Sequence, residues 1–182
     1  MKVAVLATDG VEQVELDRPW QVLEEAGAEP ELVSLEGGTI TAWNHLDKGD
    51  EKTVDAVVST ADPDAYAALV LPGGVVNGVF VRADADAVAF VTAFFEAGKP
   101  VAAICHAAWV LAEAGVVKGR RMTSWPSLAT DLRNAGAEWV DEEVVVDGNL
   151  VTSRNPDDLD AFGAAIVERF AEGEEQPAEE TG

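Results

Sequence analysis

The sequence contains a single cysteine, Cys105, and only two histidines. One cysteine excludes an internal disulfide and a cluster of cysteine ligands, and two histidines without clustered partners argue against a metal site. No apolar run approaches the ~20 residues that span a bilayer. The opening stretch "MKVAVLATDG" has one lysine and an apolar run too short for a signal peptide, so we expect a cytoplasmic protein without a membrane partner.

Positive charge is also scarce: 12 lysine and arginine residues stand against 34 aspartate and glutamate residues, a formal net charge of −22. A surface this negative repels phosphates, which argues against nonspecific binding to nucleic acid or to anionic membranes. Acidic surfaces with few lysines also occur in proteins adapted to high salt, where self-repulsion is screened. Apolar residues make up 48% of the chain, enough for one domain with a substantial core.

Short apolar runs alternate along the chain with stretches of helical spacing. The runs that predict strands are 2–8, 29–35, 68–74, 100–105 and 120–124. The stretches that predict helices are a segment ending at Ala26, followed by 84–98, 106–115, 126–135 and 156–172. This alternation favours βαβ units around a mostly parallel sheet, and hence a three-layer α/β sandwich.

Two further stretches have β character. Residues 138–153 contain an Asp-Gly pair between two β-rich runs, which predicts a hairpin. Residues 36–60 predict a β-rich insertion at the edge of the sheet. We expect a single domain over residues 1–172, followed by an acidic disordered tail over residues 173–182, because the tail lacks apolar anchors.

Unusual residues gather where three of the predicted strands end. The first strand is followed by Glu12 and Glu15, the third ends in Gly73 and Gly74, and the fourth ends at Cys105. In open α/β sheets, binding and catalytic sites form at the carboxyl ends of the strands. We therefore expect these side chains to share one site.

Cys105 has the setting of a nucleophile at a sharp turn from strand to helix. Such an elbow needs small residues two positions away on either side, and alanines occupy both places. Free N–H groups at a helix start stabilise a thiolate, and the backbone N–H groups of His106 and of the Gly-Gly turn are candidate oxyanion donors. Free cysteine is also among the most buried residue types. Spacing alone therefore leaves open whether Cys105 is a nucleophile or an inert buried thiol.

Three stretches together resemble the PfpI branch of the DJ-1/PfpI superfamily. They are "DGVEQVEL" (9–16), "ALVLPGG" (68–74) and the long run that begins "AICHAAWVLAEAG" (103–159). The similarity runs in one order from residue 2 to about residue 170. It implies a flavodoxin-like α/β sandwich with Cys105 as the nucleophile of a cofactor-independent enzyme. It also implies a homodimer or a higher oligomer built from dimers.

The resemblance implies roles for three further side chains. Glu15 matches the acid that lies against the nucleophile's sulfur, where a protonated carboxyl donates a hydrogen bond to a thiolate. Glu12 matches a second acidic position, for which a solvated carboxylate on the first helical turn is the simpler interpretation. His106 matches a histidine that is a candidate general base, often paired with an acid from the adjoining subunit.

The chain departs from the family pattern after the Gly-Gly turn. The acid that pairs with the histidine usually lies there, but residues 73–82 contain none, and the nearest polar side chain is Asn77. Without an orienting carboxylate a histidine can adopt the wrong tautomer, so we expect a Cys-His dyad rather than a triad. Trp125 can wall the pocket or pack in the core. For His45 we expect a structural or interface role at a turn, and for Arg154 a structural role at a strand end.

The resemblance leaves three functions open. The first is glyoxalase or deglycase action on methylglyoxal or its early adducts, with Cys105 forming a hemithioacetal. The second is an intracellular cysteine peptidase, which needs an extended cleft and a competent base. The third is a redox-sensing or chaperone-like stress protein, in which Cys105 is oxidised and Glu15 stabilises the sulfinate. Glutamine amidotransferase chemistry shares the elbow, but the sequence shows neither a separate synthetase domain nor a downstream His-x-Glu pair, so we expect it least. The expected partner is therefore a small aldehyde or a peptide.

Overall fold

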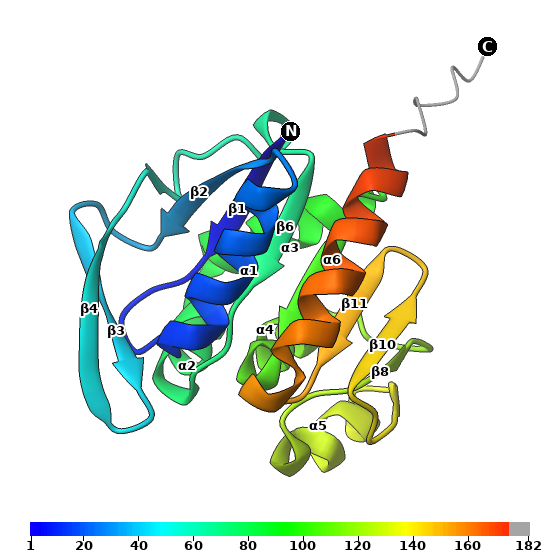
Figure 1. Ribbon diagram of the computed structural model, residues 1–182. Helices are drawn as coiled ribbons and strands as arrows, with labels where there is room; N and C mark the ends of the chain where they lie inside the picture. The colour runs from blue at the N-terminus through cyan, green and yellow to red at the C-terminus, as the bar shows by residue number, and fades with distance from the viewer. Residues whose placement is uncertain (175–182) are drawn as a thin grey trace.

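The computed structural model describes residues 1–174, which form a central sheet with helices on both faces (Figure 1). The sheet has seven strands in the order β10-β11-β7-β6-β1-β2-β5. Their bounds are β1 (Lys2–Leu6), β2 (Glu29–Ser34), β5 (Ala56–Val57), β6 (Ala68–Leu71), β7 (Val101–Ile104), β10 (Val144–Asp147) and β11 (Leu150–Ser153). Every neighbouring pair is parallel except β10–β11. The predicted α/β sandwich with a mostly parallel sheet is confirmed.

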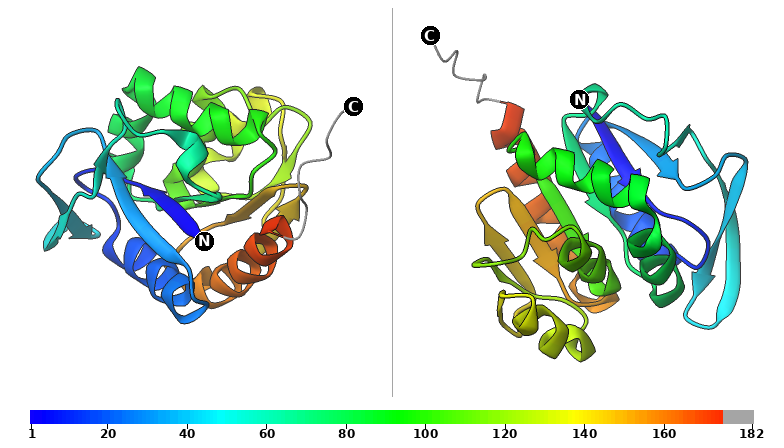
Figure 2. Two further views of the ribbon diagram at one scale, coloured as in Figure 1. Left: turned by 90° about the horizontal axis from the view of Figure 1, so that it is seen from above. Right: turned by 180° about the vertical axis from the view of Figure 1, so that it is seen from behind.

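Two groups of helices cover the sheet, as the view from above shows (Figure 2). One face carries α1 (Gln13–Glu25) and α6 (Leu159–Glu174), and the other carries α2 (Val75–Ala83), α3 (Ala85–Glu96) and α4 (Ala108–Glu113). A small parallel pair, β8 (Arg121–Met122) and β9 (Glu138–Trp139), lies with α5 (Ala129–Asn134) beyond α4 and β10.

The core forms two layers, one on each face of the sheet. Along β1, Val3 and Val5 pack under α1 and α6, while Ala4 and Leu6 pack under the helices of the opposite face. This alternation follows from the period of two in a strand. Because both faces are covered, the strand reads as a continuous apolar run, which is typical of parallel sheets.

The predicted β-rich stretches form two hairpins. The predicted hairpin is confirmed: β10 and β11 are antiparallel, and the turn between them is residues 148–149, because Asp147 is the last residue of β10 and pairs with Leu150. Within residues 36–60, β3 (Thr39–Asn44) and β4 (Asp47–Thr53) form their own two-stranded sheet, and the short β5 then joins the edge of the main sheet. The insertion therefore stands beside α1 and extends the main sheet only at β5 (Figure 1).

Helix α2 has no counterpart among the predicted helices. Its sequence "VVNGVFVRA" is rich in valine and contains a glycine, and both residue types have weak helix propensity. The helix begins directly after Gly74, whose φ of 98° is accessible mainly to glycine. Packing stabilises the helix despite its weak propensity, because the side chain of Val81 on α2 is buried in the core.

The carboxyl-terminal end differs slightly from the prediction. The predicted tail begins at residue 173, but α6 continues to Glu174, and residues 175–182 lie outside the part of the chain that the structure describes. The end of the helix lies close to the residue before β7, because a side chain at Gly173 would come within 2.6 Å of the Pro100 ring. Over residues 1–174, no helix has the length and apolar character to cross a bilayer.

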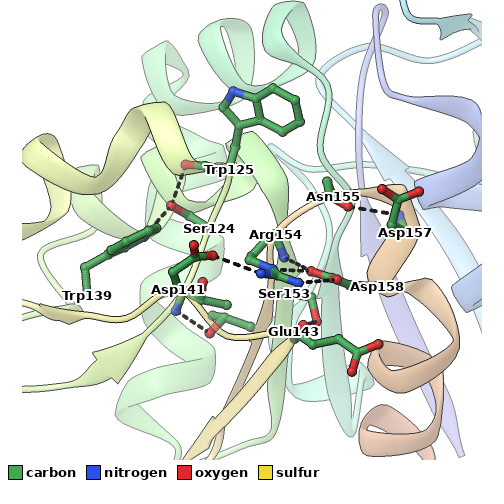
Figure 3. A network of polar contacts seen from close by, with 12 residues as sticks. Ser124, Trp125, Trp139, Asp141, Glu143, Ser153, Arg154, Asn155, Asp157 and Asp158 are labelled. Atoms are coloured by element: carbon green, nitrogen blue, oxygen red, sulfur yellow. Dashed lines mark hydrogen bonds and ion pairs between the residues drawn. The ribbon is translucent and has the colours of Figure 1, made fainter.

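Arg154 ties the end of β11 to the start of α6 (Figure 3). Its backbone N–H and two guanidinium nitrogens donate to the Asp158 carboxylate at 2.9–3.0 Å, and its third nitrogen donates to Asp141 at 2.9 Å. Asp158 is 2% exposed, so its charge depends on these donors. The contacts give Arg154 the structural role at a strand end that we expected.

We expect Asp158→Ala to lower the free energy of unfolding by about 2–3 kcal/mol, because it leaves the Arg154 donors without their buried acceptor. Asp157→Ala is the matched control, since Asp157 is exposed and the expected change is within about 0.5 kcal/mol. Urea denaturation of both variants measures the difference. Equal unfolding midpoints for the two variants would contradict the structural role of this ion pair.

Candidate active site

Cys105 follows β7 at the point where the loops after β1 and β6 also meet. Its φ of 62° places it in the left-handed region, where a residue other than glycine is strained. A 3₁₀ turn over Cys105–Ala107 then leads into α4. The Trp125 N–H donates to the Cys105 carbonyl at 3.3 Å, which tethers the turn. Cys105 is thus a strained residue at a strand-to-helix elbow, the local geometry that the sequence predicted.

The two glycines after β6 let the backbone approach the sulfur closely. A side chain at Gly73 would overlap the Glu15 carboxyl and come within 2.6 Å of the Cys105 Cβ. The backbone N–H groups of Gly74 and His106 are directed at the Cys105 sulfur, where they favour negative charge. Of the three predicted oxyanion donors, the structure therefore places Gly74 and His106 at the sulfur. Gly73 instead makes room for Glu15.

Glu15 lies on the first turn of α1 with its carboxyl enclosed beside the sulfur. The residue is 0% exposed, and over residues 1–174 neither carboxyl oxygen has a well-formed hydrogen-bond partner. The Cys105 thiol and the Gly73 amide are near enough to act on its charge, but their geometry is too poor to count as hydrogen bonds. A buried carboxyl without strong donors is most stable when protonated.

Burial disfavours the charged form of both ionisable groups. Burial, with a smaller contribution from Glu12, raises the pKa of Glu15 from its ordinary value near 4.5 to about 8. Burial and the charge of Glu15 raise the pKa of the Cys105 thiol well above its ordinary value, although the Gly74 and His106 amides lower it. The resting sulfur is therefore a thiol. Burial therefore acts on the pKa of this thiol more strongly than the backbone donors at the helix start.

His106 lies beside the thiol and between two tryptophan rings. Its Nδ1 is 3.1 Å from the Cys105 sulfur, and it is 7% exposed. The Trp125 ring stacks on the imidazole, and the Trp109 ring meets it edge-on. Burial lowers the pKa of His106 below its ordinary value, so the imidazole is neutral at neutral pH and free to accept the thiol proton.

Trp109 was absent from the predicted site. Its position, three residues after His106 in a predicted helix, places both rings on one helical face, and this spacing could have indicated the contact. Trp125 lies against His106 and is 38% exposed, so it walls the site rather than the core.

Asn77, Glu12 and His45 do not reach the sulfur. The Asn77 side chain accepts from the Thr8 N–H and donates to the carbonyls of Pro72 and Gly73, so it braces the loops after β1 and β6. The Glu12 carboxylate accepts from the His45 N–H, at the turn between β3 and β4. These contacts indicate structural roles for all three side chains.

Other clefts lie away from Cys105. A cleft of about 360 Å³ between α1 and β4 is lined by Leu16, Asp17, Trp20, Leu32, Glu51, Lys52, Thr53 and Asp55. None of these residues forms a hydrogen bond or a ring contact with Cys105 or His106. Over residues 1–174, no three histidine, cysteine or carboxylate side chains gather as a set of metal ligands. The elbow is thus the place where this chain concentrates reactive groups.

Comparison with known proteins places this site in a family. The DJ-1/PfpI family model matches residues 1–169. Deglycase TK1284 of Thermococcus kodakarensis is 47% identical over 167 residues, which cover 92% of this chain and 98% of the relative. "Putative cysteine protease YraA" of Bacillus subtilis is 42% identical over 161 residues, which cover 88% of this chain and 93% of the relative.

A solved structure shares the fold as well. The crystal structure of a two-domain protein from Anabaena variabilis, with DJ-1/ThiJ/PfpI-like and ferritin-like domains, matches with a TM-score of 0.88 at 34% identity. The match covers 94% of this chain and 50% of that one. The family model extends from β1 into α6 and so includes Glu15, the Gly-Gly turn and Cys105. The chain therefore belongs to the DJ-1/PfpI family.

Proposed function

We propose that this protein is a cysteine-dependent deglycase that acts on methylglyoxal and on its early adducts with amines and thiols. The observation that carries the proposal is the setting of the Cys105 sulfur. Two proton carriers adjoin it, the neutral imidazole of His106 at 3.1 Å and the enclosed carboxyl of Glu15. The name of the relative TK1284 supports the same reaction class.

The site residues can carry each proton that the reaction needs. Cys105 attacks the aldehyde carbon, a C–S bond forms, and the thiol proton passes to His106 Nδ1 as the carbonyl electron pair moves to oxygen. A proton then moves from the former aldehyde carbon to the neighbouring carbonyl carbon. The oxyanion on the first carbon becomes the thioester carbonyl, and the oxygen on the second carbon takes the proton held by His106, which gives a thioester of lactate. Water adds to the thioester carbonyl, the C–S bond breaks, and a proton from the water returns to the sulfur, which restores the thiol. The sum is methylglyoxal plus water to lactate. With an adduct, Cys105 displaces the amine or thiol from the same carbon: the new C–S bond forms as the bond to the leaving amine or thiol breaks, and the Cys105 thiol proton leaves with it.

The burial of the site favours a small substrate. Cys105 and His106 are 6% and 7% exposed, so an attacking sulfur reaches only a compact electrophile. A three-carbon aldehyde meets this requirement more easily than a folded polypeptide. Helix α2 leaves Val75, Val79 and Phe80 exposed nearby, an apolar face that supports the expected homodimer or higher homo-oligomer.

Incubation of the wild-type protein with a preformed adduct of methylglyoxal and N-acetyl-lysine tests the proposal. We expect lactate and free N-acetyl-lysine to appear in equal amounts, because each turnover releases both. A parallel reaction with excess aminoguanidine, which traps free methylglyoxal, separates action on the adduct from action on the aldehyde. If the folded protein releases no lactate from the adduct or from free methylglyoxal, the proposal is wrong.

Peptidase activity is the second candidate, because the relative YraA is named as a cysteine protease. It predicts cleavage of casein or of short fluorogenic peptides that is blocked by alkylation of Cys105. Cleavage at a rate above lactate formation would favour the peptidase. The redox-sensor alternative predicts instead that mild peroxide adds two oxygens to Cys105 without aldehyde turnover.

A further inference from the structure

An imidazole that accepts a thiol proton must be held in one orientation and one tautomer. A carboxylate usually does this in cysteine and serine enzymes, by accepting a hydrogen bond from the second ring nitrogen. Over residues 1–174, no carboxylate makes a hydrogen bond or an ion pair with His106, whose polar partner is the Cys105 sulfur. Within this chain, contacts other than a carboxylate therefore orient the ring.

Two tryptophans enclose the imidazole from different elements. The Trp125 ring, from the loop after β8, stacks on His106 with 5.5 Å between centroids and 25° between planes. The Trp109 ring, from α4, meets it at 5.2 Å and 65°. The face of the Trp125 ring on one side of the imidazole and the edge contact with Trp109 on another restrict rotation of the imidazole about its bond to Cβ. We call Trp109 and Trp125 the tryptophan clamp.

Trp109 is itself held in place on three sides. Its Nε1 donates to Asp131 on α5 at 3.1 Å. The Arg82 guanidinium on α2 lies over its ring at 5.6 Å and pairs with Glu113 at 3.0 Å. The ring therefore has anchors on α2 and α5 in addition to its own helix.

Trp125 is held through its backbone and its neighbour (Figure 3). Its N–H donates to the Cys105 carbonyl at 3.3 Å, and its own carbonyl accepts from the Ser124 hydroxyl at 2.9 Å. The same hydroxyl accepts from Trp139 Nε1 at 2.9 Å. The loop that carries the stacking ring is thus fastened both to the elbow and to β9.

The packing of α2 leaves little room for an acid at the expected place. A Cβ at Gly78 would lie 3.0 Å from the His106 carbonyl and 3.5 Å from the Trp109 ring. A side chain there would crowd the His106 carbonyl, while its Cβ would make only an ordinary contact with the Trp109 ring. The glycine therefore lets α2 approach the backbone of the elbow closely, beside the clamp.

We propose that Trp109 and Trp125 are positioning residues that replace an orienting carboxylate and hold His106 Nδ1 toward the Cys105 thiol. The inference rests on the proposed role of His106 as the proton acceptor. The neighbouring charged groups are Glu15 beyond the sulfur, and Arg82 and Asp131, which engage Trp109. The clamp also keeps water from the ring, which agrees with the lowered pKa of His106.

Long-range proton–nitrogen NMR of the ¹⁵N-labelled protein tests the clamp without any substrate. In the wild type we expect a single neutral His106 tautomer, with the proton on Nε2, because Nδ1 faces the thiol. Trp125→Ala should give a mixture of tautomers and raise the titration midpoint of His106 by about half a pH unit or more. Trp125→Phe keeps a stacking face and should resemble the wild type. His45, at the distant hairpin turn, is the internal reference.

Two outcomes would overturn the clamp. One is an unchanged His106 tautomer and titration in Trp125→Ala and in Trp109→Ala. The other is a Trp125→Phe spectrum as altered as that of Trp125→Ala, which would indicate a general loss of packing. Trp125 is 38% exposed, and unchanged His45 signals would show that the fold persists. Because the readout needs no turnover, failure of the clamp and failure of the proposed deglycase activity are separate results.

Discussion

Cys105→Ala is expected to abolish lactate formation from methylglyoxal and its adducts, with a loss of about 10⁴-fold or more relative to the wild type. The variant removes the atom that forms the bond to the aldehyde carbon, while Glu15 and His106 remain. No other thiol can substitute for it, because the chain has one cysteine. Lactate release measured by a coupled assay, with folding checked by thermal unfolding, gives the result. Turnover that persists in this variant would exclude Cys105 as the nucleophile.

The same position also allows the strain at the elbow to be measured. At φ 62° an alanine is as strained as the cysteine, whereas glycine is at ease there. We therefore expect Cys105→Gly to unfold at higher urea than Cys105→Ala, by about 1 kcal/mol, although neither variant turns over substrate. Equal stability of the two variants would show that the elbow stores no strain. The comparison separates the effect of losing the reactive thiol from the effect of backbone strain at this position.

The fold and the elbow were predictable because both depend on patterns among residues that are close together in the sequence. Apolar runs such as 100–105 identify strands that are buried on both faces, and small residues around Cys105 permit the sharp turn. The carboxyl ends of neighbouring parallel strands meet, which brings Glu15, the Gly-Gly turn and Cys105 together. The role of Glu15 came from the family resemblance, since a glutamate on a first helical turn is otherwise an ordinary partner of the helix dipole.

Other parts of the site depend on contacts that local patterns do not contain. Helix α2 was missed because its valines favour a strand, and only packing against α4 and the core makes it helical. The contact of Trp125 with His106 joins residues from two loops that no spacing rule connects. The protonation of Cys105 also follows from burial, which depends on the whole fold rather than on the start of one helix.

Glu15→Gln is expected to make the protein more stable at neutral and alkaline pH. The pKa of Glu15 is near 4.5 in an unfolded chain and about 8 in the folded protein, so the folded state binds the proton more tightly. The stability from this group is complete below pH 4.5, falls as the pH rises toward 8, and then levels off. The slope reaches at most about 1.4 kcal/mol per pH unit. Glutamine fills the same space without a charge and removes this slope.

Urea denaturation of Glu15→Gln and of the wild type at pH 5, 6.5 and 8 measures this effect. The advantage of the variant should grow across the series, and Glu25→Gln, at an exposed position of the same helix, is the matched control. A constant difference between variant and wild type would show that the Glu15 carboxyl does not titrate in this range.

The same substitution should cost the protein its activity. Glutamine cannot release or take up the proton that the reaction moves beside the sulfur, so we expect kcat to fall by about 10²–10³-fold with little change in KM. Glu15→Asp keeps the carboxyl but withdraws it from the sulfur, and should retain more activity than Glu15→Gln. A Glu15→Gln protein with full turnover would restrict Glu15 to a structural role. A variant that is both more stable and nearly inactive would instead show that the Glu15 carboxyl lowers the stability of the fold but is needed for proton transfer.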